Sequence, residues 1–154
     1  MAVEDISEKI IIYTDGGSRG NPGDAALGVV MKDVSGKILK SYGKTLGVMT
    51  NNEAEYQAIV FALQKAKALL GRARTRNLRV EIRADSQLLV RQLNAEYKIE
   101  EPRLFPFFIA VWNLKMDFGE VSFRHIPREE NREADRLVNE ALDKTQGELF
   151  DISP

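Results

Sequence analysis

Lys9-Ile-Ile-Ile-Tyr-Thr-Asp15-Gly16-Gly17 is the stretch around which the rest of the chain can be interpreted. Its apolar run, residues 10–13, is rich in β-branched and aromatic side chains and is soon followed by a carboxylate and two glycines. Such a run predicts a strand that is buried on both faces and lies in the middle of a sheet. The glycines allow a sharp turn and leave open space beside Asp15. Because an aspartate at a strand end most often forms a turn, Asp15 becomes a catalytic candidate only if further carboxylates converge on it.

The composition is that of an ordinary globular protein. With 154 residues, 44% hydrophobic and 29% charged, the chain is expected to form a single domain, with a core at about residues 9–144 and a frayed C-terminal tail at 145–154. The absence of cysteine excludes disulfides, thiol catalysis and cysteine-based zinc sites. Residues 1–8 lack the features of a secretion signal, and no apolar stretch is long enough to span a bilayer. We therefore expect a cytoplasmic, monomeric protein with no membrane partner.

Net charge gives no general support for nucleic-acid binding, because it is only −1. A nucleic-acid partner must therefore be argued from a local site. The most visible basic run, Arg72, Arg74, Arg76 and Arg79, lies between a predicted helix and the start of a strand. This position is at the end of the strand away from the candidate carboxylates, so we interpret the run as a solvated surface.

Periodicity predicts an α/β protein whose elements follow one another in the order βββαβαβα. Strands are predicted at residues 10–13, 26–32, 38–45, 78–83 and 121–125. The first three should form an antiparallel meander, with a turn-rich loop at residues 16–23. The fourth is reached through a helix and should therefore lie parallel to an earlier strand. The prediction is a five-stranded mixed sheet flanked by helices.

Two neighbouring glutamates have different explanations. Thr50 and Glu53 form a capping box, in which each side chain bonds the backbone of the other residue at the start of a helix. That helix should end at Gly71. Glu55 lies two residues after Glu53 and so points well away from it. Because capping does not explain Glu55, this residue is a candidate for function.

Four carboxylates are predicted to meet at one edge of the sheet. Asp15 and Asp85 each follow a strand, and both project from the same edge if those strands are parallel neighbours. Glu55 and Asp135 lie in early turns of helices that begin near Asn51 and Asn131. Four acids repel one another unless cations lie among them. Because all the ligands are oxygen atoms, the cluster favours Mg²⁺ or Mn²⁺, and two such ions about 3.5–4 Å apart suit in-line phosphoryl displacement.

Four motifs resemble those of type 1 ribonuclease H, and they occur in the order typical of that family. They are Tyr13-Thr-Asp15-Gly-Gly-Ser-Arg-Gly-Asn21-Pro-Gly23, Thr50-Asn-Asn-Glu-Ala-Glu55-Tyr56, Ala84-Asp85-Ser-Gln87 and His125-Ile-Pro-Arg-Glu-Glu-Asn131-Arg-Glu-Ala-Asp135. Each motif alone is weak evidence, but together they are highly specific. The resemblance covers residues 9–142. Within the family, the chain resembles the compact branch, which lacks a basic protrusion. The stretch between the third motif and the fifth strand contains no lysines other than Lys98 and Lys115.

The resemblance implies a ribonuclease H-like fold and an endonuclease that hydrolyses the RNA strand of RNA–DNA hybrids. Its products would be 3′-hydroxyl and 5′-phosphate ends, and its cofactors two Mg²⁺ or Mn²⁺ ions. Asp15 would bridge both ions, while Glu55 and Asp85 would hold the ion that stabilises the leaving 3′ oxygen. Asp135 would hold the ion that activates water. His125, the only histidine, would assist proton transfer or product release; its alternative role is that of a solvent-facing loop residue.

The resemblance also implies a set of substrate-binding residues. Those that would contact the 2′-hydroxyls, minor-groove edges and a phosphate of the hybrid are Asn21, Thr50, Asn51, Asn52 and Gln87. Cations placed to meet further phosphates are Arg19, Lys98, Arg128 and Arg132. Two alternatives stay open. A nuclease of the same fold could also cut double-stranded RNA, because reading 2′-hydroxyls in the minor groove serves both duplexes, or the chain could be a hybrid-binding module without activity.

Overall fold

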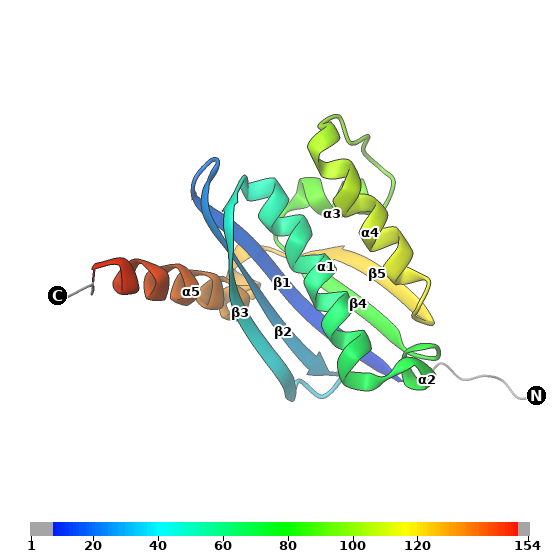
Figure 1. The fold of residues 1–154 in the computed structure, drawn as a ribbon. Helices are drawn as coiled ribbons and strands as arrows, with labels where there is room; N and C mark the ends of the chain where they lie inside the picture. Colours follow the sequence, from blue (N-terminus) through cyan, green and yellow to red (C-terminus); the bar gives the residue numbers. More distant parts are fainter. Residues whose placement is uncertain (1–7, 151–154) are drawn as a thin grey trace, which may run out of the picture.

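The computed structural model describes the backbone of residues 8–150 and the side chains of residues 8–145. Five strands form one mixed sheet in the order β3-β2-β1-β4-β5 (Figure 1). The strands are β1 (Lys9–Gly20), β2 (Gly23–Asp33), β3 (Ile38–Met49), β4 (Arg79–Ala84) and β5 (Glu120–His125). The helices are α1 (Asn51–Leu70), α2 (Arg72–Thr75), α3 (Gln87–Leu93), η1 (Pro102–Leu104), α4 (Phe105–Lys115), η2 (Arg128–Glu130) and α5 (Arg132–Phe150).

The predicted topology is confirmed. Strands β1, β2 and β3 form an antiparallel meander, and β4 lies parallel to β1 on its other side. Strand β5 lies parallel to β4 and closes the sheet at the edge opposite β3. Helices α1, α3 and α4 cover one face of the sheet, and α5 packs on the other face against β2 and β3 (Figure 1).

Strand β1 is longer than predicted, and the prediction of a loop at residues 16–23 is wrong. Pairing between β1 and β2 continues from Ile10–Asp33 to Gly20–Gly23, so only the dipeptide between them turns the chain. Asp15 therefore lies inside β1 rather than at its end. Its position is nevertheless special, because the parallel pairing of β1 with β4 stops one residue earlier, at Thr14–Ala84.

The expectation that this strand is buried on both faces is also wrong. Ile10, Ile12 and Thr14 are at most 2% exposed, whereas Ile11 and Tyr13 on the opposite face are only half-buried. The cause is the placement of the helices. The face with α1 is covered completely, while α5 covers mainly β2 and β3 and leaves part of the other face of β1 open.

Helix α5 corrects the prediction of a tail that frays from residue 145. The helix continues to Phe150, and residues 151–154 lie outside the described part of the chain. Once a helix has formed, each added residue gains a backbone hydrogen bond, so extension beyond the sheet costs little. Within residues 8–150, none of the helices combines the length with the apolar character that a bilayer span requires.

The main core lies between α1 and the sheet. Helix α1 buries Tyr56, Ile59, Val60, Leu63 and Ala66, and Gly71 ends the helix as predicted, with a φ of 83°. Inside this core the Tyr56 hydroxyl donates to Gln92 Oε1 over 2.8 Å, which satisfies two polar groups buried between α1 and α3.

Candidate active site

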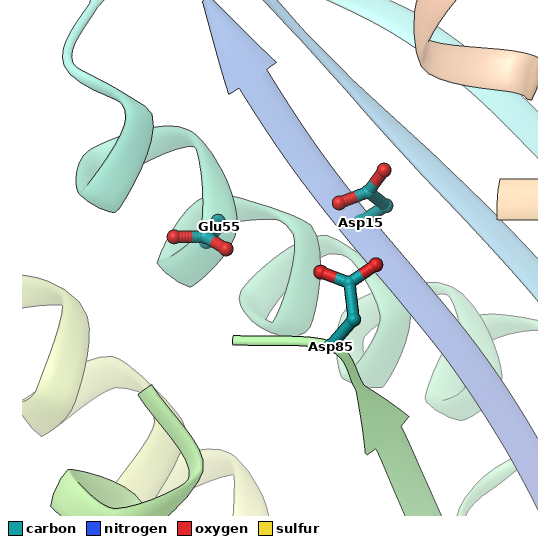
Figure 2. Close-up of side chains that lie close together, drawn as sticks. All are labelled: Asp15, Glu55 and Asp85. Atoms are coloured by element: carbon teal, nitrogen blue, oxygen red, sulfur yellow. The ribbon is translucent and has the colours of Figure 1, made fainter. Parts of the chain in front are cut away.

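Three carboxylates meet where β4 ends. One oxygen each from Asp15 on β1, Glu55 on α1 and Asp85 just after β4 lie within 4.8 Å of one another (Figure 2). Because β4 stops at Ala84, the parallel ladder leaves the side of β1 open from Asp15 onwards. Glu55 reaches this opening from the first turns of α1. The prediction that these three acids converge is confirmed.

Asp135 joins the cluster from the opposite face of the sheet. It lies in the first turn of α5, near enough to Asp15 that its carboxylate is one of the groups that raise the pKa of Asp15. All four acids line one cavity of about 360 Å³, together with Asn51, Arg128 and residues of α5. Asp135 does not belong to the group of three oxygens within 4.8 Å. The site therefore consists of Asp15, Glu55 and Asp85 close together, with Asp135 on the same cavity beside Asp15.

Two glycines bring the helices close enough to form this cluster. A Cβ on Gly16 would lie 2.3 Å from the backbone carbon and oxygen of Ala54, so α1 packs directly on β1 and positions the next residue, Glu55. A Cβ on Gly28, which pairs with Asp15, would lie 2.1 Å from the Ala134 carbonyl oxygen. The expectation that the glycines leave open space beside Asp15 is therefore wrong at Gly16, because the backbone of α1 fills that space.

The cluster resists carrying its full negative charge. Burial, followed by repulsion from Asp85, Asp135 and Glu55, raises the pKa of Asp15 from 3.8 to about 8. Burial and repulsion from Asp85 raise the pKa of Glu55 from 4.5 to about 7, although a hydrogen bond from Ser86 and the charge of Arg128 act in the opposite direction. A cation among these oxygens would remove the repulsion.

This electrostatic arrangement predicts an unusual pH dependence for the metal-free protein. Because the pKa values of Asp15 and Glu55 are higher in the folded state than when the chain is unfolded, the folded state binds more protons between about pH 4 and pH 8. Their contribution to the free energy of unfolding should therefore fall as the pH rises through that window and level off above it. Melting temperatures measured in EDTA from pH 5 to pH 8 check this, with Asp15→Asn as the reference protein. Equal slopes for the two proteins would contradict it, and Mn²⁺ should stabilise the wild type most at pH 8.

Glu53 and Glu55 give a matched pair for testing the site. The predicted capping box is present, since Thr50 Oγ1 accepts from the Glu53 amide over 3.1 Å and Glu53 Oε1 accepts from the Thr50 amide over 2.9 Å. A glutamine keeps that second bond, so Glu53→Gln should retain most of the hybrid cleavage that the motif resemblance predicts. Glu55→Gln removes a charge from the cluster and should lower kcat on the order of 10²-fold or more. Steady-state kinetics of the two variants check this, and similar losses in both would show that Glu55 has no special role.

Among the residues predicted to bind the substrate, Asn51 lines the cavity, and Asn21 and Asn51 also hold the structure together. Asn21 Oδ1 accepts from the Asn51 amide over 3.0 Å, and Asn51 Oδ1 accepts from the Ser18 amide over 2.9 Å. These bonds tie the tip of the β1–β2 hairpin to the start of α1. Within the Asn21 and Asn51 side chains these bonds use only the oxygens, so the side-chain N–H groups are not engaged in them. Thr50 and Asn52 are half-buried beside them, and Gln87 is exposed at the start of α3.

The four cations predicted to meet phosphates do not all lie at the cavity that holds the carboxylates. Arg128 lines the cavity, and Arg132 is exposed at the start of α5. Arg19 also lines the cavity but forms an ion pair of 2.7 Å with Asp143 of α5. Lys98 lies elsewhere, at an apolar cavity of about 490 Å³ beside α4. The basic run that begins in α2 lies at the opposite end of β4 from the carboxylates, as expected.

His125 does not line the cavity. It is exposed at the end of β5, where it pairs with Ala84, the residue before Asp85. Sequence reasoning missed Asn131, which is 1% exposed and donates to Asp85. Asn131 stood out only by its place in the fourth motif and before a helix, which is also where an ordinary helix cap stands.

Comparison with known proteins identifies the family. A family model described as reverse transcriptase-like matches residues 13–141. LC11-RNase H1, which was isolated from compost and crystallised in complex with an RNA/DNA hybrid, is 46% identical to the chain. The two structures superpose with a TM-score of 0.84 over 89% of this chain and 99% of that one. The chain belongs to the type 1 ribonuclease H family.

Further relatives extend the family comparison. Ribonuclease HI of Halobacterium salinarum is 41% identical over 88% of the chain. The N-terminal RNase H domain of Rv2228c from Mycobacterium tuberculosis is 32% identical, with a TM-score of 0.82 over 93% of this chain and 99% of that one. The chain spans 65% of the Halobacterium protein and 39% of the complete mycobacterial protein, which is named bifunctional. In the described chain no helix other than the short η1 lies between α3 and α4, where the sequence predicted no basic protrusion.

Proposed function

We propose that the protein is an endonuclease that hydrolyses the RNA strand of RNA–DNA hybrids and leaves 3′-hydroxyl and 5′-phosphate ends. The observation that carries this proposal is the group of three carboxylate oxygens from Asp15, Glu55 and Asp85 within 4.8 Å. Such a group destabilises the folded protein unless a cation neutralises it, because burial and mutual repulsion both oppose its ionisation. Membership of the ribonuclease H family, and the relative crystallised with an RNA/DNA hybrid, support this proposal.

The site fits divalent metal ions, Mg²⁺ or Mn²⁺. Its ligands are carboxylate oxygens alone, which hard cations prefer, and a cation would offset the burial and mutual repulsion that raise the pKa values of Asp15 and Glu55. Asp15, Glu55 and Asp85 would hold one ion, and Asp135 with Asp15 would hold a second. When bound, the ions would supply charge stabilisation at the phosphate and lower the pKa of water.

The protein's own residues would orient the scissile phosphate and move protons. Arg128, on the cavity wall, carries a positive charge that can meet a phosphate oxygen. His125 lies outside the cavity at the end of β5, where an exposed imidazole is placed to exchange a proton with solvent during product release.

Neutral donors would recognise the duplex. The side-chain N–H groups of Asn21 and Asn51 are unused in the hairpin-to-helix bonds, and the Thr50 hydroxyl can donate to a phosphate while its oxygen caps α1. Together with Asn52 and Gln87, these groups would contact sugars and base edges in the minor groove, where a 2′-hydroxyl distinguishes RNA from DNA.

A cleavage assay with three end-labelled duplexes of one sequence tests the proposal. The substrates are an RNA–DNA hybrid, double-stranded RNA and double-stranded DNA, each incubated with Mg²⁺, Mn²⁺ or EDTA. We expect cuts only in the RNA strand of the hybrid, only with metal, and with ends that accept ligation as 3′-hydroxyl and 5′-phosphate. Cleavage of double-stranded RNA as well would broaden the substrate class. Binding of the hybrid without cleavage under any metal would overturn the proposal in favour of a binding module.

A further inference from the structure

Asn131 is the last residue before α5 and one of the few buried polar side chains in the described part of the protein. Its Nδ2 donates two hydrogen bonds. One, of 2.8 Å, goes to the backbone oxygen of Thr14, and the other, of 3.1 Å, goes to Asp85 Oδ2. The side chain is therefore in direct contact with one of the candidate metal-binding carboxylates.

The hydrogen bonding shows why an amide is needed at this position. An asparagine before a helix usually uses its oxygen to accept from a backbone N–H of the first turn. Here Asn131 Oδ1 is buried and has no hydrogen-bond partner among the described residues, while both N–H groups are used. Rotating the amide by half a turn would place its oxygen against two acceptors. Serine has one donor and ionised aspartate has none, so only the amide satisfies both partners.

Asn131 also links the elements that carry three of the four acids. Thr14 precedes Asp15 at the point where β1 and β4 stop pairing, so Asn131 binds β1 just where the ladder ends. Asp85 receives the second bond. The backbone oxygen of Asn131 accepts from the amide of Asp135 over 3.1 Å in the first turn of α5.

We propose that Asn131 is a positioning residue for the metal site. It holds Oδ2 of Asp85 in a fixed direction and so presents Oδ1 to a divalent cation, while it fixes β1 and α5 at the distance that the cluster needs. This inference rests on the proposed function. Residues that hydrogen-bond to a metal ligand and orient it commonly contribute about 10- to 100-fold to metal affinity or activity.

The experiment compares wild type with Asn131→Ala and Asn131→Ser. Mn²⁺ binding to each full chain is measured by calorimetry, and hybrid cleavage is measured across a series of Mg²⁺ concentrations. We expect Asn131→Ala to raise the Kd for Mn²⁺ and the Mg²⁺ midpoint by about 10- to 100-fold, with little change in KM for the hybrid. Asn131→Ser, which keeps one donor, should lose less.

A control separates positioning from stability. Gln92 is 6% exposed, and its side-chain oxygen accepts a hydrogen bond from the Tyr56 hydroxyl, away from the carboxylates. Gln92→Ala therefore removes a buried amide comparable to that of Asn131. It should lower the melting temperature but leave the Mn²⁺ affinity unchanged. The inference is overturned if folded Asn131→Ala binds Mn²⁺ like wild type, if its Mn²⁺ affinity falls no more than that of Gln92→Ala, or if neither Asn131 variant folds. A wild type that neither binds Mn²⁺ nor cleaves the hybrid would overturn the proposed function as well.

Discussion

Asp85→Asn is expected to abolish cleavage of an RNA–DNA hybrid while the protein stays folded and still binds the duplex. The substitution removes one negative charge from the group of three oxygens and changes almost no volume. If metal binding by this group supplies about 4 kcal/mol of transition-state stabilisation, kcat should fall by about 10³-fold. The new side chain can still accept from Asn131 Nδ2 through its carbonyl oxygen, so the bond that holds the chain after β4 is kept.

The metal-free protein should show the opposite effect on stability. Asp85 is a cause of the raised pKa values of both Asp15 and Glu55, so removing its charge relieves repulsion in the folded state. The melting temperature of Asp85→Asn in EDTA should equal or exceed that of wild type, and its increase on adding Mn²⁺ should be smaller. Thermal melts with and without metal, beside a hybrid-binding titration, check these expectations. Wild-type turnover by the variant would refute the assignment of Asp85.

The sequence was sufficient to predict the topology and the convergence of the acids. Runs of β-branched residues end near Asp15 and Asp85, and a helix precedes the second run, so the carboxyl ends of the two strands meet at one edge if the strands are parallel neighbours. The structure confirms that pair in the order β1-β4. The capping box explained Glu53 and so selected Glu55, which the structure places in the cluster.

Other features depend on tertiary contacts that no local pattern contains. The glycines after Asp15 are common turn residues, and only their pairing with β2 shows that they continue a strand. The half-buried face of β1 follows from where α5 lies, not from the apolar run itself. Likewise, an asparagine before a helix predicts a cap, whereas Asn131 uses its donors on Thr14 and Asp85, far away in the sequence.

The second large effect is expected from Gly16→Ala, which should both destabilise the protein and impair the site. The added Cβ would overlap the Ala54 carbonyl at 2.3 Å and the Glu55 amide at 2.5 Å. These are backbone atoms in the first turns of α1, so they cannot move aside as a flexible side chain can. Overpacking of this kind costs roughly 3 kcal/mol, or about 6–12 °C in melting temperature for a chain of this size.

Gly17→Ala is the matched control for this prediction. A Cβ on Gly17 would meet Val138 Cγ1 at 3.7 Å and Asn51 Oδ1 at 4.0 Å, which are ordinary contacts, so its melting temperature should stay within a few degrees of wild type. If α1 relieves the overlap in Gly16→Ala by moving away from β1, Glu55 moves with it and the group of three oxygens widens. The Mg²⁺ concentration needed for half-maximal cleavage should then rise even at temperatures where the variant is fully folded. Equal melting temperatures for the two alanine variants would show that the close packing of α1 on β1 does not hold the site together.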